Sequence, residues 1–327
     1  MKAVLVRAFG PFADVRIEDI SPAPLKPGQV RIQVALAAAN PPDWLMAQGK
    51  YQVRPELPFA LGVEGAGVVI EVADDVTTVK LNDRVMSYAG QGCFAEQVVA
   101  PAHLVYPIPA SMPFEIAGGF ALVYGTAYHA LVDRGQLAAG ETVVVLGAAG
   151  GIGLCAIQIA KALGATVIAL ASSAEKRATC RAYGADHTIE SDQADLKSSL
   201  LACTNGKGAD IVLDPVGGAL TMSTLRALRT YGRHLIVGYS SGEIPQIPAN
   251  YLLLKQVSVI GVSFRQCAQN NPVLARTDIS ALTRMWQQGT LKPHVAQIHP
   301  FEKFADAIEA LSGRAAIGKH LIRIAQL

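Results

Sequence analysis

The sequence lacks the features of several large protein classes. Its charges nearly cancel, with 28 Lys and Arg against 26 Asp and Glu, and no basic run is present. Charge therefore gives no indication of a nucleic-acid partner or an anionic membrane. No apolar run approaches the roughly 18 residues that span a bilayer, and the N-terminal stretch breaks at Gly10-Pro11 before a signal-peptide core. We expect an untargeted, cytoplasmic protein with no membrane partner.

Patterns typical of metal sites and disulfide frameworks are missing as well. The five cysteines are scattered, odd in number and free of C-x-x-C spacing, which favours reduced thiols. None of the seven histidines shows H-x-x-H or H-E-x-x-H spacing. The sequence has no internal repeat and no low-complexity segment. Spacing alone therefore predicts no metal site.

What is present predicts two domains. A chain of 327 residues, 51% of them hydrophobic, can fill two cores. Residues 1–122 hold many short strands separated by proline and glycine turns, such as Asn40-Pro41-Pro42, as in a β-rich domain. Residues 123–265 alternate strands with helices, which is typical of a doubly wound parallel sheet, so the fold class is α/β. We expect residues 266–327, with helical stretches at 278–289 and 301–313 and a final strand, to return to the first domain.

The most informative stretch is a glycine-rich turn between a strand and a helix. Thr142 to Leu146 is short, apolar on both faces and β-branched, as in a central parallel strand. Glycines follow at Gly150, Gly151 and Gly153, and a helix is expected from Leu154 to Leu163. Such a turn lets backbone N–H groups approach a pyrophosphate at the N-terminus of the helix. The predicted phosphate-binding residues are Ala149, Gly150, Gly151, Ile152 and Gly153.

The strand and helix pattern around this turn makes it stronger evidence for nucleotide binding than an isolated glycine motif would be. A second strand is expected at Ala165 to Ala171, which completes a βαβ unit of about 30 residues. The first glycine of the G-x-G-x-x-G pattern is replaced by Ala148, so the pattern is relaxed. The alternative is a glycine turn in an unrelated α/β domain.

The end of the second strand bears on the choice of cofactor. An NAD site usually has an acidic residue there that accepts the ribose 2′-hydroxyl, but here the position is Ala171. Ser172 and Lys176 follow, and neither repels a 2′-phosphate. We therefore predict NADP(H), bound in part by Ser172 and Lys176. The alternative for Lys176 is the solvated face of a helix at residues 175–183.

Seven short motifs occur along nearly the whole chain. They are Ala39-Asn-Pro-Pro-Asp43, Pro58-Phe-Ala-Leu-Gly-Val-Glu-Gly-Ala-Gly67, Gly92-Cys-Phe-Ala-Glu96, Tyr124-Gly-Thr-Ala-Tyr128, Ala148-Ala-Gly-Gly-Ile-Gly153, Ser172-Ser-Ala-Glu-Lys176 and Val237-Gly-Tyr-Ser-Ser-Gly242. With them the chain resembles the zinc-independent quinone oxidoreductase (zeta-crystallin-like) group of medium-chain dehydrogenases/reductases. The resemblance implies a GroES-like catalytic domain built from both chain ends around a Rossmann domain. It also implies hydride transfer from NADPH to a quinone or an α,β-unsaturated carbonyl.

The resemblance further implies roles for individual residues. Zinc-dependent relatives carry a cysteine near Asn40 and a histidine at Val63, so no metal is expected. Asn40 and Thr126 would line the nicotinamide, and Tyr51 would overhang the substrate, with Asn40 and Tyr51 as the candidate catalytic residues. The alternative for Tyr51 is a half-buried loop residue. Gly238, Tyr239 and Ser240 complete the predicted cofactor contacts.

Two other functions remain open at this stage. The chain could be an enoyl-thioester reductase of the acrylyl-CoA type, or a non-catalytic zeta-crystallin-like binding protein.

Glu190 departs from the pattern of the relatives, and a carboxylate near a 2′-phosphate is unfavourable for NADP(H) binding. The β-prone run Val257 to Phe264 is expected at the edge of the sheet, where pairing with a second copy would give a homodimer.

Overall fold

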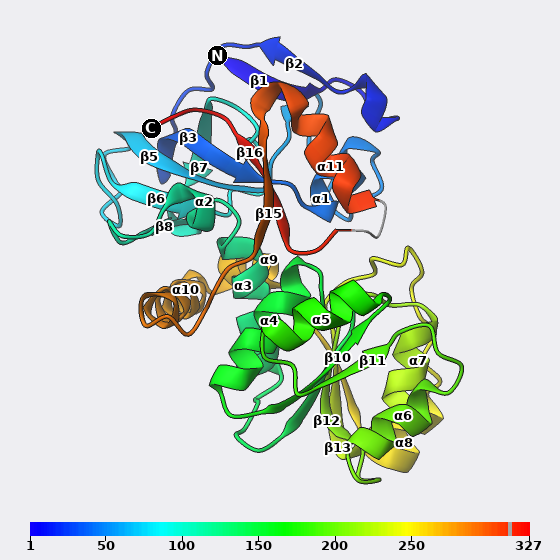
Figure 1. Cartoon of the computed structure of the whole chain (residues 1–327). Helices are drawn as coiled ribbons and strands as arrows, with labels where there is room; N and C mark the ends of the chain where they lie inside the picture. Colours follow the sequence, from blue (N-terminus) through cyan, green and yellow to red (C-terminus); the bar gives the residue numbers. More distant parts are fainter. Residues whose placement is uncertain (313–315) are drawn as a thin grey trace. The chain divides into compact units, whose positions relative to one another are not determined.

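The computed structural model describes residues 1–312 and 316–327. Contacts divide the chain into two units (Figure 1). The first unit consists of Met1–Leu122, Asn270–Ile279 and Val295–Leu327. The second consists of Val123–Gln269 and Ser280–His294. The C-terminal stretch is thus shared between the units, since residues 280–294 belong to the second.

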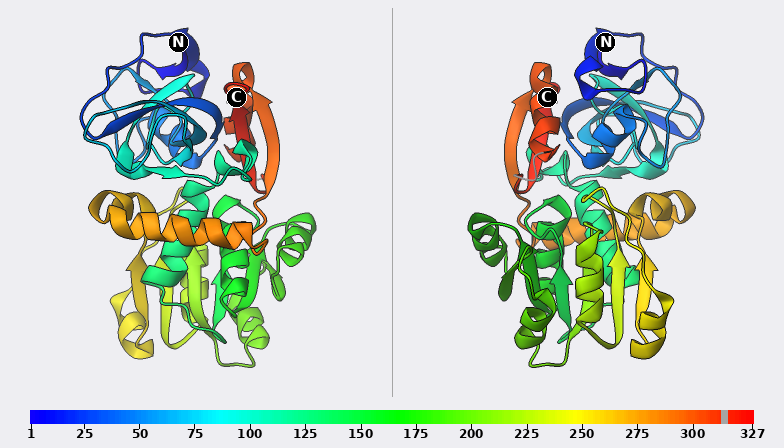
Figure 2. Two further views of the ribbon diagram at one scale, coloured as in Figure 1. Left: turned by 90° about the vertical axis from the view of Figure 1, so that its left-hand side faces the viewer. Right: turned by 90° about the vertical axis from the view of Figure 1, so that its right-hand side faces the viewer.

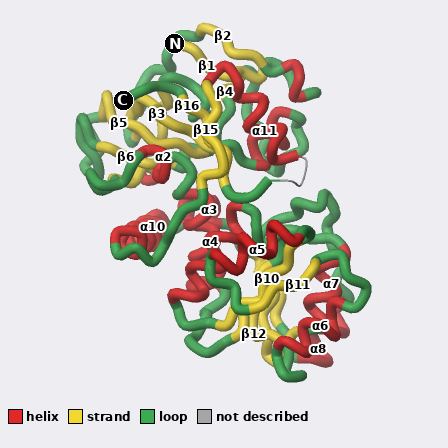
Figure 3. The backbone as a smooth tube through the Cα atoms, in the orientation of Figure 1, coloured by secondary structure: helices red, strands yellow, loops and turns green. Residues whose placement is uncertain are grey.

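The first unit is built from β-strands. Its elements are β1 Lys2–Val6, η1 Phe12–Asp14, β2 Arg16–Asp19, β3 Gln29–Ala38, α1 Pro41–Ala47, β4 Phe59–Ala60, β5 Glu64–Val72, β6 Arg84–Ser87, β7 Gln97–Pro101, η2 Ala102–Leu104, β8 Val105–Pro107, α2 Phe114–Ala117, β15 Val295–Pro300, η4 Phe301–Lys303, α11 Phe304–Ser312 and β16 Lys319–Arg323. Figure 3 shows the predominance of strands and loops in this unit. The β-rich domain predicted from the sequence is confirmed.

Strand β3 is the centre of the larger sheet of this unit. The sheet has the order β15-β16-β3-β5-β6-β8, and β7 also pairs with β3. Residues 29–34 of β3 alternate between half-buried and buried positions, and residues 35–38 are buried throughout. Such a strand pairs on both edges and packs on both faces near its end. Because β16 pairs antiparallel with β3, the C-terminal strand lies beside the residues that precede Asn40.

Helix α1 differs from the expectation drawn from the sequence. We expected Asn40-Pro41-Pro42 to punctuate the strands as a turn, but the helix begins at Pro41. Proline is tolerated in the first helical turn because its missing N–H has no intrahelical partner there. Asn40 precedes the helix in an extended conformation, and its backbone N–H donates to Asp43 Oδ2 at 2.9 Å. The prolines therefore start a helix here.

The second unit alternates strands and helices. Its elements are η3 His129–Arg134, β9 Thr142–Val145, α4 Gly151–Ala162, β10 Thr166–Ala171, α5 Ala174–Ala182, β11 His187–Glu190, α6 Leu196–Cys203, β12 Ala209–Asp214, α7 Ala219–Arg226, β13 Leu228–Ile236, α8 Ala249–Lys255, β14 Ser258–Gly261 and α9 Phe264–Asn270. Two further helices, α3 Ala121–Tyr128 and α10 Pro272–Gln287, cross the division between the units, as does α9 at its last residue, Asn270. Helices flank both faces of the central sheet (Figure 2).

The sheet of the second unit is parallel and doubly wound. Its strand order is β11-β10-β9-β12-β13-β14, which is the Rossmann order. Strands β9, β10 and β12 are almost wholly buried, as a central parallel sheet requires. The order reverses between β9 and β12, so a crevice is expected above the carboxyl ends of these two strands. The predicted fold class is confirmed.

Two elements differ in their bounds from those expected. The run from residue 257 to 264 forms only the short strand β14, and Phe264 already starts α9. Helix α10 begins at Pro272, before the run starting at residue 278 that we expected, since proline is favoured at a helix start. The last helical run was expected to reach Gly313, which lies outside the described residues. Within the described residues, no helix is both long and apolar enough to cross a membrane.

Candidate functional site

The turn between β9 and α4 has the geometry that its glycines predicted. Helix α4 starts directly after Gly150, which is extended at φ −75° and ψ 174°. A Cβ on Gly153 would lie 2.5 Å from the carbonyl oxygen of Ala148, so only glycine lets the helix lie this close to the turn. The N–H of Ala148 donates to Leu170 O at 3.0 Å, which fixes the turn to β10. Gly150 and Gly151 stay partly exposed at the N-terminus of α4.

The loop that follows β12 lies beside the glycine turn, and the loop that follows β13 lies beside that loop. Val216, just after β12, approaches the glycine turn, since a Cβ on Gly147 would lie 3.0 Å from Val216 Cγ2. The N–H of Gly238 donates to Asp214 O at 3.3 Å, and the N–H of Ser240 donates to Pro215 O at 3.0 Å. The fold thus brings Gly238 to Ser240 beside the loop after β12, which borders the switch point between β9 and β12. Their role as cofactor contacts stays a prediction.

The end of β10 carries the residues predicted to select the cofactor. Ser172 is exposed, and Lys176 is half-buried in the first turn of α5. Glu190 at the end of β11 is the register partner of Ala171. The neighbouring strand therefore places an acid beside the position where β10 has none. Arg177 pairs with this carboxylate at 3.6 Å, which offsets its charge in part.

In the first unit, Asn40 belongs to a buried cluster of polar groups. Its Nδ2 donates to Ala38 O at 3.0 Å and to Glu64 Oε1 at 3.1 Å. Its Oδ1 accepts from the ammonium of Lys319 at 2.6 Å. Both N–H groups of the amide are therefore engaged within the first unit, and the side chain is only 1% exposed.

Lys319 and Glu64 complete this cluster. Lys319 Nζ donates to Glu64 Oε1 at 3.0 Å and to Ala39 O at 3.3 Å. Glu64 Oε2 accepts from the N–H of Leu122 at 2.9 Å. Sequence reasoning missed both roles, although Glu64 lies in the motif Pro58 to Gly67. Nothing local marks Lys319, since its partners lie 255 and 279 positions away along the chain.

Asp43 ties the start of α1 to the segment before β5. Its Oδ1 accepts from the N–H groups of Gly62 and Val63, at 3.1 and 3.0 Å. Burial raises the pKa of Asp43 to about 7, against the opposing effect of these donors and of the Lys319 charge. The backbone of Val63 is thus fixed to the helix that follows Asn40.

The two remaining predicted residues belong to different units. Tyr51 is half-buried in the loop after α1, in the first unit. Thr126 lies on α3 in the second unit and is also half-buried. Their roles at a substrate or a nicotinamide ring stay predictions.

Comparison with known proteins supports the reading of both units. Residues 26–110 match the family model described as alcohol dehydrogenase GroES-like domain, and residues 151–278 match that described as zinc-binding dehydrogenase. Quinone oxidoreductase-like protein 2 from Bos taurus is 37% identical over 310 residues, which cover 94% of this chain and 88% of the relative.

Solved structures give the same picture. Quinone oxidoreductase from Pseudomonas syringae has a TM-score of 0.93 and 31% identity, covering 98% of this chain and 99% of that one. Escherichia coli quinone oxidoreductase, complexed with NADPH, has a TM-score of 0.91 and 26% identity, covering 99% and 100%.

Fold, glycine turn and relatives together define a medium-chain dehydrogenase/reductase. Within this superfamily, the chain belongs to the quinone oxidoreductase family and is an oxidoreductase. The resemblance stated from the sequence motifs is thereby confirmed.

The buried cluster gives a first prediction. Lys319→Met would remove the ammonium and leave the carboxylate of Glu64 buried without its cation. Stripping one partner from a buried ion pair costs about 3–5 kcal/mol. Urea unfolding followed by circular dichroism should show a loss of this size. Lys26→Met, at an exposed lysine of the same unit, is the control and should change stability by less than about 0.5 kcal/mol. Equal effects of the two variants would contradict the role given to Lys319.

Proposed function

We propose that this protein is a cytoplasmic, NADPH-dependent reductase that delivers hydride to a quinone or an α,β-unsaturated carbonyl without zinc. The observation that carries the proposal is the glycine turn at the switch point of the sheet, with Ser172 and Lys176 at the end of β10. The complex of the Escherichia coli relative with NADPH supports the cofactor. The five cysteines are scattered and show no C-x-x-C spacing, which supports a reducing compartment.

The chemistry demands little of the protein beyond positioning. NADPH supplies the hydride, and a quinone or enone is already electrophilic. The chain must therefore hold donor and acceptor carbon together and stabilise the oxyanion that develops. In this proposal the loop of Gly238, Tyr239 and Ser240 and the helix residue Thr126 support the nicotinamide half. Tyr51 offers a hydroxyl to the acceptor oxygen.

The residues at the zinc-ligand positions of relatives argue against a metal there. The side chain of Val63 has no atom that could bind a metal ion. Asn40 Oδ1 already accepts a hydrogen bond from the Lys319 ammonium at 2.6 Å. A metal ion bound at that oxygen would face this buried positive charge, and neither Asn40 nor Val63 offers a thiolate or an imidazole. In the proposal Asn40 instead sets the entry into α1, and with it the loop that carries Tyr51.

A substrate panel tests the activity. Purified protein should oxidise NADPH with ortho- or para-quinones, 2-alkenals or enones, and chelation with EDTA should leave the rate unchanged. Turnover restricted to acrylyl-CoA would replace the proposal by an enoyl-thioester reductase. Binding of NADPH without turnover of any acceptor would indicate a non-catalytic binding protein.

Cofactor preference gives a sharper prediction. If Lys176 meets the 2′-phosphate, Lys176→Ala removes a charge-assisted contact that NADPH makes and NADH does not. Such contacts contribute about 1.5–3 kcal/mol, so NADPH binding should weaken roughly ten- to a hundredfold with NADH binding almost unchanged. Fluorescence titration measures both dissociation constants.

The matched control for this titration is Lys207→Ala. Lys207 is an exposed lysine in the turn before β12, at the opposite end of the strands from the glycine turn. It should leave both dissociation constants unchanged. Equal weakening of NADPH and NADH by Lys176→Ala would mean that Lys176 supports the fold or the shared part of the cofactor.

We further propose that two copies form a homodimer through β14. This strand is the outer strand of its sheet, and its residues are exposed or half-buried. Just before it, α8 exposes Leu253 and Leu254 at 77% and 76%. An unpaired edge next to exposed leucines is favourable for pairing with a second copy.

Light scattering after size exclusion tests this dimer. At micromolar concentration the mass should be twice the 34.4 kDa of one chain. Leu254→Glu should shift the equilibrium towards the monomer, because it places a charge on the apolar surface. Leu81→Glu, at an exposed leucine of the first unit, is the control and should leave the dimer intact. A monomeric wild-type protein would refute the proposal.

A further inference from the structure

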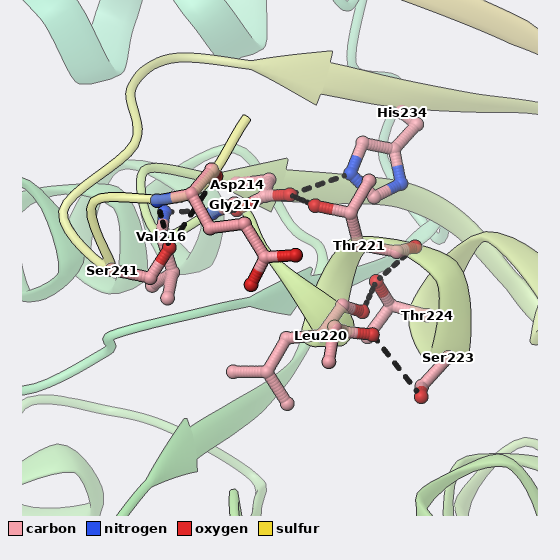
Figure 4. Close-up of polar contacts among 11 residues, drawn as sticks. Asp214, Val216, Gly217, Leu220, Thr221, Ser223, Thr224, His234 and Ser241 are labelled. Atoms are coloured by element: carbon pink, nitrogen blue, oxygen red, sulfur yellow. Dashed lines mark hydrogen bonds and ion pairs between the residues drawn. The ribbon is translucent and has the colours of Figure 1, made fainter. Parts of the chain in front are cut away.

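The second unit contains a completely buried carboxylate with four hydrogen-bond donors. Asp214 ends β12 and is 0% exposed. Its Oδ1 accepts from the N–H groups of Val216 and Gly217, each at 2.8 Å. Its Oδ2 accepts from Thr221 Oγ1 at 2.6 Å and from His234 Nε2 at 3.0 Å. Figure 4 shows the side chains of α7 and β13 converging on this one group.

The donors keep this carboxylate ionised. Burial alone would raise the pKa of Asp214, but the hydrogen bonds from His234, Gly217 and Thr221 hold it below its usual value. A carboxylate can only accept, so His234 must carry its proton on Nε2. Its Nδ1 is buried without a hydrogen-bond partner in the described structure. His234 thus serves as a donor to Asp214 in the interior of the sheet.

Through its backbone, Asp214 also joins the loops after β12 and β13. Its carbonyl oxygen accepts from Val237 N at 2.9 Å, at the point where β13 ends. Further along, Ser241 N donates to Val216 O at 2.9 Å, and Gly218 N donates to Glu243 O at 3.1 Å. These bonds combine the two loops into one platform, which we define as residues 215–218 and 237–243.

The glycines of this platform need the carboxylate to fix them. Gly217 and Gly218 have φ values of +74° and +61°, a conformation that glycine adopts without strain. A segment of this kind has many other conformations open to it, so its shape depends on external contacts. The two bonds to Asp214 Oδ1 supply those contacts at residues 216 and 217.

The platform lies where one half of a dinucleotide must rest. In a doubly wound sheet the pyrophosphate sits at the glycine turn after the first strand, and the adenosine ribose lies over the end of the second. These strands are β9 and β10 here. The nicotinamide half therefore extends to the other side of the switch point, over β12 and β13. Val216 lies beside Gly147 at this boundary.

We propose that Asp214, Thr221 and His234 form a positioning network that holds the platform of residues 215–218 and 237–243 in the shape that receives the nicotinamide half of NADPH. The inference rests on the proposed function. Asp214 is completely buried and acts through the loop, so all three are positioning residues. The network raises affinity for the nicotinamide half and leaves the adenine half unaffected.

Helix α7 offers a matched pair of variants for the test. Thr221 and Thr224 are both 0% exposed, and Thr→Val preserves the shape of either side chain. Only Thr221 donates to Asp214, whereas Thr224 Oγ1 contacts Leu220 O at 2.8 Å and Thr221 O at 3.2 Å (Figure 4). Thr221→Ser retains the hydroxyl and serves as the rescue variant.

Each variant is titrated with NADPH and with 2′,5′-ADP, which carries only the adenine half. Thr221→Val should raise the dissociation constant of NADPH about three- to tenfold, as expected for one lost charge-assisted hydrogen bond partly compensated by the other three. The dissociation constant of 2′,5′-ADP should not change. Thr224→Val and Thr221→Ser should bind both ligands as the wild type does.

The outcomes separate this inference from the proposed function. Equal effects of Thr221→Val and Thr224→Val on NADPH binding, or equal weakening of NADPH and 2′,5′-ADP by Thr221→Val, would overturn the network. A lower unfolding midpoint for Thr221→Val with an unchanged NADPH constant would show a purely structural role and overturn it as well. A wild-type protein that binds no NADPH would overturn the proposed function, and this inference with it.

Discussion

Burying a carboxylate costs several kcal/mol unless donors surround it, and each unit of this protein depends on one such group. In the first unit the carboxylate of Glu64 accepts hydrogen bonds from Lys319, from Asn40 and from the backbone N–H of Leu122. In the second unit the carboxylate of Asp214 accepts four hydrogen bonds, from the loop after β12, from α7 and from β13. In each case the carboxylate fixes segments that would otherwise be free to adopt other shapes.

These two groups perform different structural work. Glu64 and Lys319 connect the C-terminal strand β16 to the residues just before α1. The C-terminal part of the chain is thereby held in the same unit as the N-terminal part. Asp214 lies at the switch point of the parallel sheet and joins the loops that follow β12 and β13. Beside these loops, α4 lies close to the backbone of Ala148 in the glycine turn, which only glycine at residue 153 permits.

Local pattern predicted the second unit well. The apolar run from Thr142, the spaced glycines and the following helix gave the βαβ unit, and the structure has it as β9, α4 and β10. Parallel strands buried on both faces leave a strong local signal, because nearly every residue must be apolar. The start of α1 was missed, since Pro41 and Pro42 are compatible with a turn as well as with a first helical turn.

At the end of β10, where the cofactor is expected to be selected, the sequence alone was also insufficient. The sequence showed that Ala171 stands where an NAD site usually has an acidic residue. It also showed that Glu190 departs from the pattern of the relatives. Only the parallel register of β10 and β11 shows that Glu190 is the direct neighbour of Ala171, with Arg177 beside it. Register is a property of two paired strands, so the sequence of one strand alone does not show which residue of the other lies beside it.

The sequence by itself determined the architecture and the position of the glycine turn, because these follow from apolar periodicity and from glycines whose conformational freedom no other residue shares. Its seven short motifs carried the resemblance to the family. The tertiary structure decided the partners of the buried charges. Lys319 meets Glu64 across 255 positions, and His234 meets Asp214 across 20. A hydrogen bond needs its two atoms within about 3 Å, and only the folded chain brings together residues that far apart in sequence.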